Sequence, residues 1–235
     1  MIRLFVNAPL TPNAIVPLDE KSHHYLVHVM RCKNQEQLLC FNGCDGEWIA
    51  ELQFVNKKTA HLVILNSNRP QTTPTYCALC PALIKKDNMD LVLQKATELG
   101  VTDIYPILSD HTVHAHFNKE HAELVVREAA EQCERLTLPV VHPPMKIPAV
   151  MADLPKNCLC YCLSEREKDS DSLPKSGKVA FFVGPEGGWS EKEKQFFKTN
   201  NLKSLHFDVG ILRAETASIA ILSCWQIGRA LYLKK

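Results

Sequence analysis

The sequence lacks both common glycine-rich nucleotide signatures. No GxGxxG follows the strand expected at residues 77–84, and no GxxxxGK[ST] occurs anywhere. These absences argue against a Rossmann dinucleotide site and a P-loop NTPase. No run of about eighteen apolar residues is present either, so we expect no membrane span. The opening MIRLFVNAPLTPN has no sustained apolar segment of the kind found in signal peptides.

An excess of charge of either sign is also missing. Lys and Arg number 27 against 26 Asp and Glu, for a formal net charge of +1. Any RNA contact must therefore come from local basic patches. A hydrophobic content of 46% with 23% charged residues is ordinary for a globular protein, and 235 residues suffice for one large or two small domains.

Cysteine is abundant, but its spacing does not indicate metal sites or disulfides. Cys158, Cys160 and Cys162 alternate along a predicted strand and are expected to act as small core residues. Cys77 and Cys80 form a single CxxC without a second pair, and His111, His114 and His116 have no paired ligand spacing. We therefore expect no metal and a cytoplasmic protein with reduced thiols.

The chain divides by pattern into a β-rich part and an α/β part. The first is expected to hold strands at 37–42, 47–55 and 59–65 and a helix near 22–30, and the polar stretch 66–74 has the composition of a linker. Alternating strands (77–84, 104–108, 158–163, 179–183, 204–208) and amphipathic helices then follow. We expect domains at residues 1–70 and 71–235, the second with a largely parallel sheet.

The stretch FFVGPEGGWSEKE, residues 181–193, interrupts this alternation with a glycine-rich turn. A buried strand ends at Val183, and Ser190 with Glu193 has the spacing of a helix capping box. Gly184, Gly187 and Gly188 would let a ligand approach the backbone closely at a strand end. The alternative, a plain tight turn, stays open on this stretch alone.

Four segments together resemble the RsmE family of RNA methyltransferases in the SPOUT superfamily. They are ALIKKDNMDLVLQKATELGVTDIYPI (82–107), VREAAEQCER (126–135), FFVGPEGGWSEKE (181–193) and VGILRAETASIA (209–220). The resemblance implies an N-terminal PUA-like β-barrel domain and a C-terminal α/β domain with a trefoil knot. It also implies a homodimer that uses S-adenosylmethionine to methylate N3 of a uridine in 16S rRNA of the small ribosomal subunit.

The resemblance also implies which residues bind the methyl donor. They lie in three turns and at the start of the last helix: Leu163, Ser164, Gly184, Pro185, Glu186, Gly187, Gly188, Val209, Gly210, Ile211, Leu212 and Ala217.

Methylation at N3 requires loss of a proton and stabilisation of a developing anion. Arg213 is the first candidate for the stabilising cation. Glu215 and Thr216 are candidates to accept the proton through water or orient the base, although Thr216 could simply cap a helix. Lys85, Arg127 and Arg135 are candidate RNA contacts, and each could equally be an ordinary surface charge. Glu98 could act at the site or pair with a neighbour.

Four positions depart from the usual family pattern: Lys86, Asp208 and Glu134 (EQCER against the common EQxGR), where glycine is usual, and Gly210, where a second arginine is usual. Two alternatives therefore stay open beside the uridine-N3 enzyme. One is a SPOUT methyltransferase for a different RNA site, and the other is an RNA-binding module without turnover.

Overall fold

The computed structural model describes residues 1–56, 58–113, 116–164, 171–174 and 176–232. The chain forms two compact units. The first comprises Met1–Thr73 together with Ala130–Leu138, and the second comprises Pro74–Ala129 together with Pro139–Lys235. A short segment from the middle of the chain thus completes the N-terminal unit.

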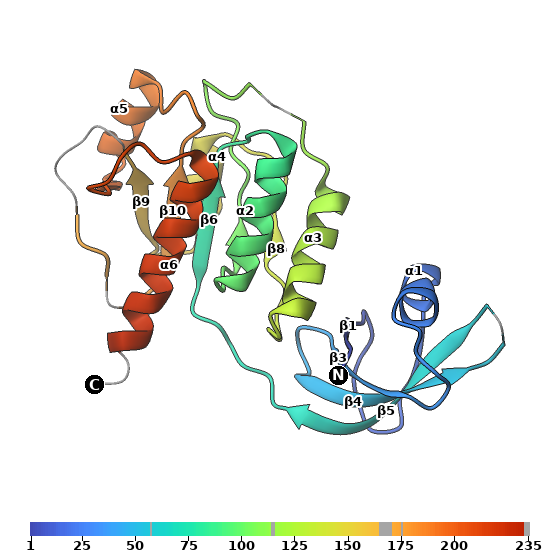
Figure 1. Cartoon of the computed structure of the whole chain (residues 1–235). Coiled ribbons are helices and arrows are strands. Elements are labelled where there is room, and N and C mark those ends of the chain that lie inside the picture. The colour runs from blue at the N-terminus through green and yellow to red at the C-terminus, as the bar shows by residue number, and fades with distance from the viewer. Residues whose placement is uncertain (57, 114–115, 165–170, 175, 233–235) are drawn as a thin grey trace. The chain divides into compact units, whose positions relative to one another are not determined.

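The first unit is a five-stranded sheet with one helical segment (Figure 1). Its strands have the order β1-β3-β4-β5-β2; β1 and β3 are parallel and the other pairs antiparallel. The elements are β1 (Arg3–Phe5), β2 (Ile15–Pro17), α1 (Glu20–His24), the π-helix η1 (Tyr25–Val29), β3 (Gln37–Phe41), β4 (Glu47–Phe54) and β5 (Ala60–Arg69).

The predicted linker at residues 66–74 is wrong in its first part, because β5 extends into it. Its last four residues, 66–69, lie in the stretch that composition assigns to a connection, yet they belong to the sheet. The reason is a buried carboxylate: Glu47 is 1% exposed and accepts hydrogen bonds from Asn68 at 2.7 Å and from Arg69 at 2.7 and 2.6 Å. Only from Pro70 onward does the chain leave the strand.

The second unit confirms the predicted α/β fold with a parallel sheet. Its strand order is β11-β9-β10-β6-β7-β8, with every pair parallel. The elements are β6 (Cys77–Pro81), α2 (Lys86–Glu98), β7 (Asp103–Ile104), α3 (Lys119–Gln132), β8 (Val140–Val141), α4 (Ile147–Asp153), β9 (Leu159–Leu163), β10 (Val179–Val183), α5 (Glu191–Thr199), β11 (Lys203–Leu205) and α6 (Ala214–Tyr232).

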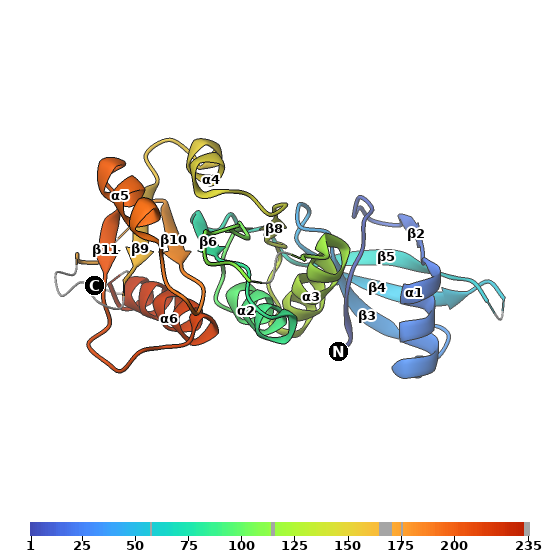
Figure 2. The same cartoon turned by 90° about the horizontal axis from the view of Figure 1, so that it is seen from above.

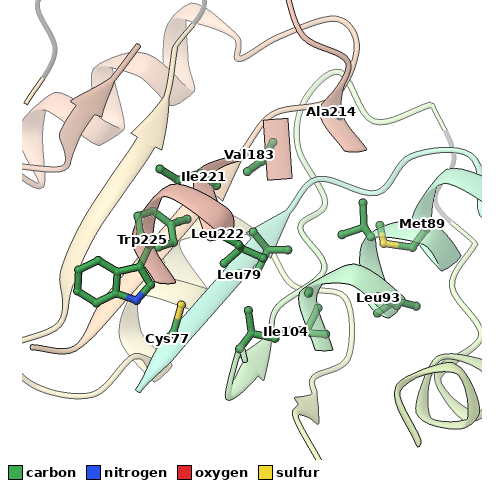
Figure 3. Packing of buried hydrophobic residues seen from close by; sticks show 14 of the residues in the cluster. Cys77, Leu79, Met89, Leu93, Ile104, Val183, Ala214, Ile221, Leu222 and Trp225 are labelled. Atoms are coloured by element: carbon green, nitrogen blue, oxygen red, sulfur yellow. The ribbon is translucent and has the colours of Figure 1, made fainter. Parts of the chain in front are cut away.

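Helices cover both faces of this sheet, which explains why β10 is buried at every position. Figure 2 shows α2 and α6 on one face and α4 and α5 on the other. On the first face, Leu222 and Trp225 of α6 pack with Leu79 of β6 (Figure 3). On the second, Phe182 lies against Phe197 of α5, with ring centroids 6.0 Å apart. A strand with two apolar faces is thus shielded on both sides.

The local sequence signals agree with the structure at the start of α5 and differ from it at three other places. The capping box of Ser190 and Glu193 is present as predicted. Asp87, expected before a helix, lies in the first turn of α2 instead. The strand expected over 104–108 shortens to β7 plus an isolated bridge at Ile107, and Cys224, expected on the core face of α6, is exposed.

Candidate functional site

A cavity of about 650 Å³ lies at the carboxyl ends of β9, β10 and β11 in the second unit. Because parallel strands end at the same edge of a sheet, the turns that follow them converge there. The lining comes mainly from Leu163 and Ser164 at the end of β9, residues 183–191 around the turn after β10, and residues 205–207 and 209–214 around the turn after β11. A cavity of this size suits a small organic ligand.

Every residue expected to bind the donor lines this cavity, so the structure brings three distant segments together. These residues are Leu163, Ser164, Gly184, Pro185, Glu186, Gly187, Gly188, Val209, Gly210, Ile211, Leu212 and Ala217.

The turn after β10 depends on its glycines. Gly188 has a φ of +68° and its N–H donates to the carbonyl of Pro185 at 2.8 Å, which closes the turn. A Cβ on Gly184 would lie 3.2 Å from the Trp189 indole ring. That ring is nearly buried, and its Nε1 donates to the carbonyl of Leu163 at 3.2 Å. Trp189 thereby links the turn after β10 to the end of β9 through this hydrogen bond.

His111 lines the same cavity, although its sequence context did not indicate a site role. Its Nδ1 lies 3.1 Å from the carbonyl oxygen of Gly187 and 3.0 Å from that of Gly188. The neighbouring Asp110 accepts a 2.6 Å hydrogen bond from the Ser190 hydroxyl. No local pattern could reveal this contact, because the two segments are separated by 76 residues.

Charged and polar groups line the cavity alongside apolar ones. Arg213 and Lys194 contribute basic side chains, and Glu186 and Glu191 acidic ones. Lys194 donates to Glu191 at 2.6 Å. The apolar part comes from residues such as Leu205, Leu212 and Ala217. Mixed walls of this kind can hold an apolar ring system and orient its polar substituents.

The three catalytic candidates differ in position. Arg213 lines the cavity, whereas Glu215 and Thr216 lie in the first turn of α6, outside the cavity lining. Glu215 is 7% exposed, and its Oε2 has no hydrogen-bond partner among the described residues. Thr216 is exposed. A buried carboxylate oxygen without a donor is costly and therefore marks a candidate functional group.

The RNA candidates are divided between the units. Lys85, exposed at the N-cap of α2, and Arg127 of α3 belong to the second unit, whereas Arg135 belongs to the first. The Arg135 guanidinium donates to Thr137 at 3.2 Å. Glu98 forms an ion pair with Lys95 at 2.7 Å, the pairing left open above. Lys86, a departure from the family pattern, starts α2 and lies 3.7 Å from Asp90.

Most of the cysteines are buried or half-buried, whereas Cys44 and Cys224 are exposed. Cys77 and Cys80 point to opposite faces of β6 and belong to different core clusters, so they cannot share one ligand. Burial raises the pKa of the Cys80 thiol well above its usual value. Within the described ranges, no group of three or more His, Cys, Asp or Glu residues could hold a metal ion; His114 lies outside them. None of the described helices has the length and apolar character needed to cross a membrane.

Two family models and several known proteins match this chain. Residues 71–226 match the family model of an RNA methyltransferase domain, and residues 18–65 match that of an RNA methyltransferase PUA domain. Ribosomal RNA small subunit methyltransferase E of Rickettsia conorii is 31% identical over 229 residues, which cover 94% of this chain and 93% of that protein. Its counterpart in Bacillus subtilis is 30% identical over 217 residues, covering 85% of each chain.

A solved structure agrees over nearly the whole chain. The ribosomal RNA small subunit methyltransferase E from Neisseria gonorrhoeae, bound to S-adenosyl methionine, superimposes with a TM-score of 0.88 at 28% identity and covers 97% of both chains. The matches in sequence and in structure extend through both units, and this chain belongs to the ribosomal RNA small subunit methyltransferase E family of RNA methyltransferases.

Proposed function

We propose that this chain is an S-adenosylmethionine-dependent methyltransferase that methylates N3 of a uridine in 16S rRNA of the small ribosomal subunit. The observation that carries the proposal is the convergence of all the expected donor-binding residues on one cavity at three strand ends. Membership of the family supports the same donor and the same class of RNA.

The cavity fits the proposed donor in size and chemistry. Its volume of about 650 Å³ exceeds what a nucleoside with a short side chain occupies. Among the described residues, apart from its chain neighbours, none has an atom within 4 Å of the position that a Cβ on Gly210 would take, so its backbone is open to a ligand. Leu205, Leu212 and Ala217 offer an apolar wall for the adenine, while backbone groups of the turns can bond its polar edge.

The residues at the cavity supply the remaining requirements of the reaction. S-adenosylmethionine brings a methyl carbon on a positively charged sulfur. Uridine N3 forms a bond to this carbon as the carbon–sulfur bond breaks with its electron pair to sulfur, and the N3 proton must leave. Arg213 stabilises the negative charge that develops on the base. Glu215 accepts the proton, directly or through water, because its Oε2 is buried without a partner among the described residues.

Three features of the architecture belong to the same proposal. The first unit closes into a PUA-like barrel that contacts RNA, and Lys85, Arg127 and Arg135 contact phosphates. The second unit contains a trefoil knot, supported by a chain path in which β11 lies beside β9 while the following α6 packs on β10 and β6. Two copies form a homodimer, and the protein acts in the cytoplasm, where small subunits are assembled.

Calorimetric titration with S-adenosylmethionine tests the donor site. Gly187→Arg should abolish binding, because Gly187 lines the cavity and a Cβ there would already lie 3.3 Å from His111. Gln195→Arg adds the same side chain at an exposed position of α5 outside the cavity and should bind as the parent does. Thermal unfolding of both variants verifies that they fold. Equal binding by Gly187→Arg and the parent would rule out the cavity as the donor site.

The RNA target requires a second measurement. Small subunits that lack the modification are incubated with the protein and labelled donor, and the methylated nucleotide is mapped by mass spectrometry of RNA fragments. A single N3-methyluridine in 16S rRNA supports the proposal. Methylation elsewhere indicates a SPOUT enzyme for another RNA site, and donor-independent RNA binding without methylation indicates a module without turnover.

A further inference from the structure

The loop Ser109–Thr112 is fastened to the glycine-rich turn after β10 at two separate places. The first is the His111 ring, whose Nδ1 lies 3.1 and 3.0 Å from the carbonyl oxygens of Gly187 and Gly188. The second is Asp110. Its N–H donates to Glu193 at 3.0 Å, and its carboxylate accepts from the Ser190 hydroxyl at 2.6 Å.

The contacts determine which nitrogen of His111 carries hydrogen. Both partners of Nδ1 are carbonyl oxygens, which only accept hydrogen bonds, so Nδ1 must donate. The neutral ring and the protonated ring both have a hydrogen on Nδ1 in this arrangement. Both forms of the ring can therefore donate from Nδ1 to the turn.

Two consecutive carbonyl groups held in this way restrict the turn. A peptide unit is planar, so fixing a carbonyl also fixes the direction of the N–H that follows it. Gly187 and Gly188 have no side chains of their own to limit the backbone, and without an external contact they would sample many conformations. His111 itself lines the cavity, as do both glycines, so the contact lies in the cavity wall.

We propose that His111 is a positioning residue for the methyl donor, acting through Nδ1–H bonds that hold the turn at Gly187 and Gly188 in its binding conformation. The inference rests on the proposed function in assuming that this cavity holds S-adenosylmethionine. It goes further by proposing that His111, which lies on a separate loop, keeps this part of the cavity wall in the conformation that binds the donor. Asp110 keeps that loop in place independently, so the His111 side chain can be changed without releasing the loop.

Three substitutions separate the Nδ1 hydrogen bonds from the bulk of the ring. In His111→Asn, the side-chain amide nitrogen can occupy the place of Nδ1. In His111→Gln, the amide nitrogen lies one bond farther from the backbone. In His111→Leu, the side chain has no hydrogen-bond donor. His121→Leu is the matched control, because His121 also makes a side-chain hydrogen bond, to Asp90 at 2.9 Å, but lies outside the cavity.

We expect His111→Leu and His111→Gln to raise the Kd and the KM for S-adenosylmethionine about tenfold, the effect of losing one or two ordinary hydrogen bonds. The kcat at saturating donor should stay within about twofold of the parent value, since saturating ligand restores the binding conformation. His111→Asn should bind within about threefold of the parent, because one such hydrogen bond survives. Unchanged affinity in His111→Leu, or an Asn variant no better than the Leu variant, would overturn the inference.

A donor-free measurement keeps this test independent of the proposed function. The Gly188 amide donates to Pro185 inside the turn, so its hydrogen exchange reports how often the turn opens. Exchange at Gly188 should be several times faster in His111→Leu than in the parent and in His121→Leu. Equal exchange rates would refute the positioning role even if the protein methylates RNA. A parent that fails to bind donor but shows the exchange difference would refute the proposed donor site, and with it the role of His111 toward the donor, while confirming that His111 holds the turn.

Discussion

Three glutamates are buried among the described residues, and they differ in how many hydrogen bonds their carboxylates accept. Glu47 accepts from two arginines and an asparagine, and Glu193 accepts from the backbone N–H groups of Asp110 and Ser190. Glu215 has one oxygen without a partner in the described part of the chain. The hydrogen bonds of the folded protein satisfy the first two carboxylates, whereas one oxygen of the third lacks a partner among the described residues, as the proposed proton acceptor requires.

Glu215→Gln should therefore slow methyl transfer without weakening the fold. The amide cannot accept a proton from uridine N3, so kcat should fall about a hundredfold or more. The donor Kd should change little, because Glu215 does not line the cavity. Single-turnover methylation of RNA, with urea unfolding as a check, measures both effects. Glu123→Gln on α3 is the control, and a Glu215 variant of parental rate would exclude the proton-accepting role.

Glu47 supplies a prediction on acid stability. Burial acts to raise the pKa of its carboxyl, but hydrogen bonds from Arg69, Arg3 and Asn68 outweigh burial and lower the pKa from 4.5 to about 2. A carboxyl whose pKa falls on folding stabilises the folded protein at pH values above the pKa that the carboxyl has in the unfolded chain. That stabilisation is lost as the pH falls from about 4.5 to about 2.

We expect Glu47→Gln to be destabilised by about 3 kcal/mol near neutral pH, with the difference from the parent shrinking as the pH is lowered through this range. Urea unfolding of both proteins between pH 2.5 and 6 checks the expectation. A difference that stays constant with pH would show that Glu47 acts through packing alone.

At the scale of single elements, α5 shows how one residue serves both a helix and the site. Ser190 caps this helix through the N–H of Glu193 and also donates to Asp110 on the loop that carries His111. Replacing its hydroxyl thus removes a cap and one attachment of the loop.

Ser190→Ala should lower the free energy of unfolding by about 1 kcal/mol, the usual effect of losing an N-cap. Lys192→Ala, on the exposed face of the same helix, should change it by less than about 0.5 kcal/mol. Chemical denaturation compares the three proteins. A Ser190 variant as stable as Lys192→Ala would mean that the capping box does not hold α5.

Elements formed by local patterns were predictable, and those formed by distant pairing were not. The buried run of β10 and the capping box of α5 lie within a few residues, so the sequence alone indicated both. Strands β1 and β2 have three residues each and owe their conformation to β3 and β5, which no local pattern reveals. The same applies to the site: turn residues were found by resemblance, whereas His111 reaches them only through the fold.

At the scale of the whole molecule, the proposed homodimer gives a further prediction. Ile227 and Leu231 lie one turn apart on α6 and are 58% and 65% exposed. Two large apolar side chains on one face of a helix are typical of a surface that another protein covers.

Replacing both with aspartate should convert a dimer to a monomer, because two buried charges without partners destabilise an apolar interface. Sedimentation at several protein concentrations measures the change. The pair Ile15→Asp and Val29→Asp, exposed on the first unit, is the control and should leave the dimer intact. A variant of α6 that sediments as the parent does would place any interface elsewhere.

The first unit is built from two separate segments of the chain, and this affects the order in which the protein can fold during its synthesis. Arg3 donates to the carbonyls of Ala130 and Arg135, and Phe41 is buried together with Ala130 and Leu136. A nascent chain that ends at residue 73 has all five strands but not the segment that covers this apolar cluster. The N-terminal unit therefore becomes complete only after more than half of the chain has left the ribosome, and until then the apolar surface around Phe41 stays uncovered and open to chaperones.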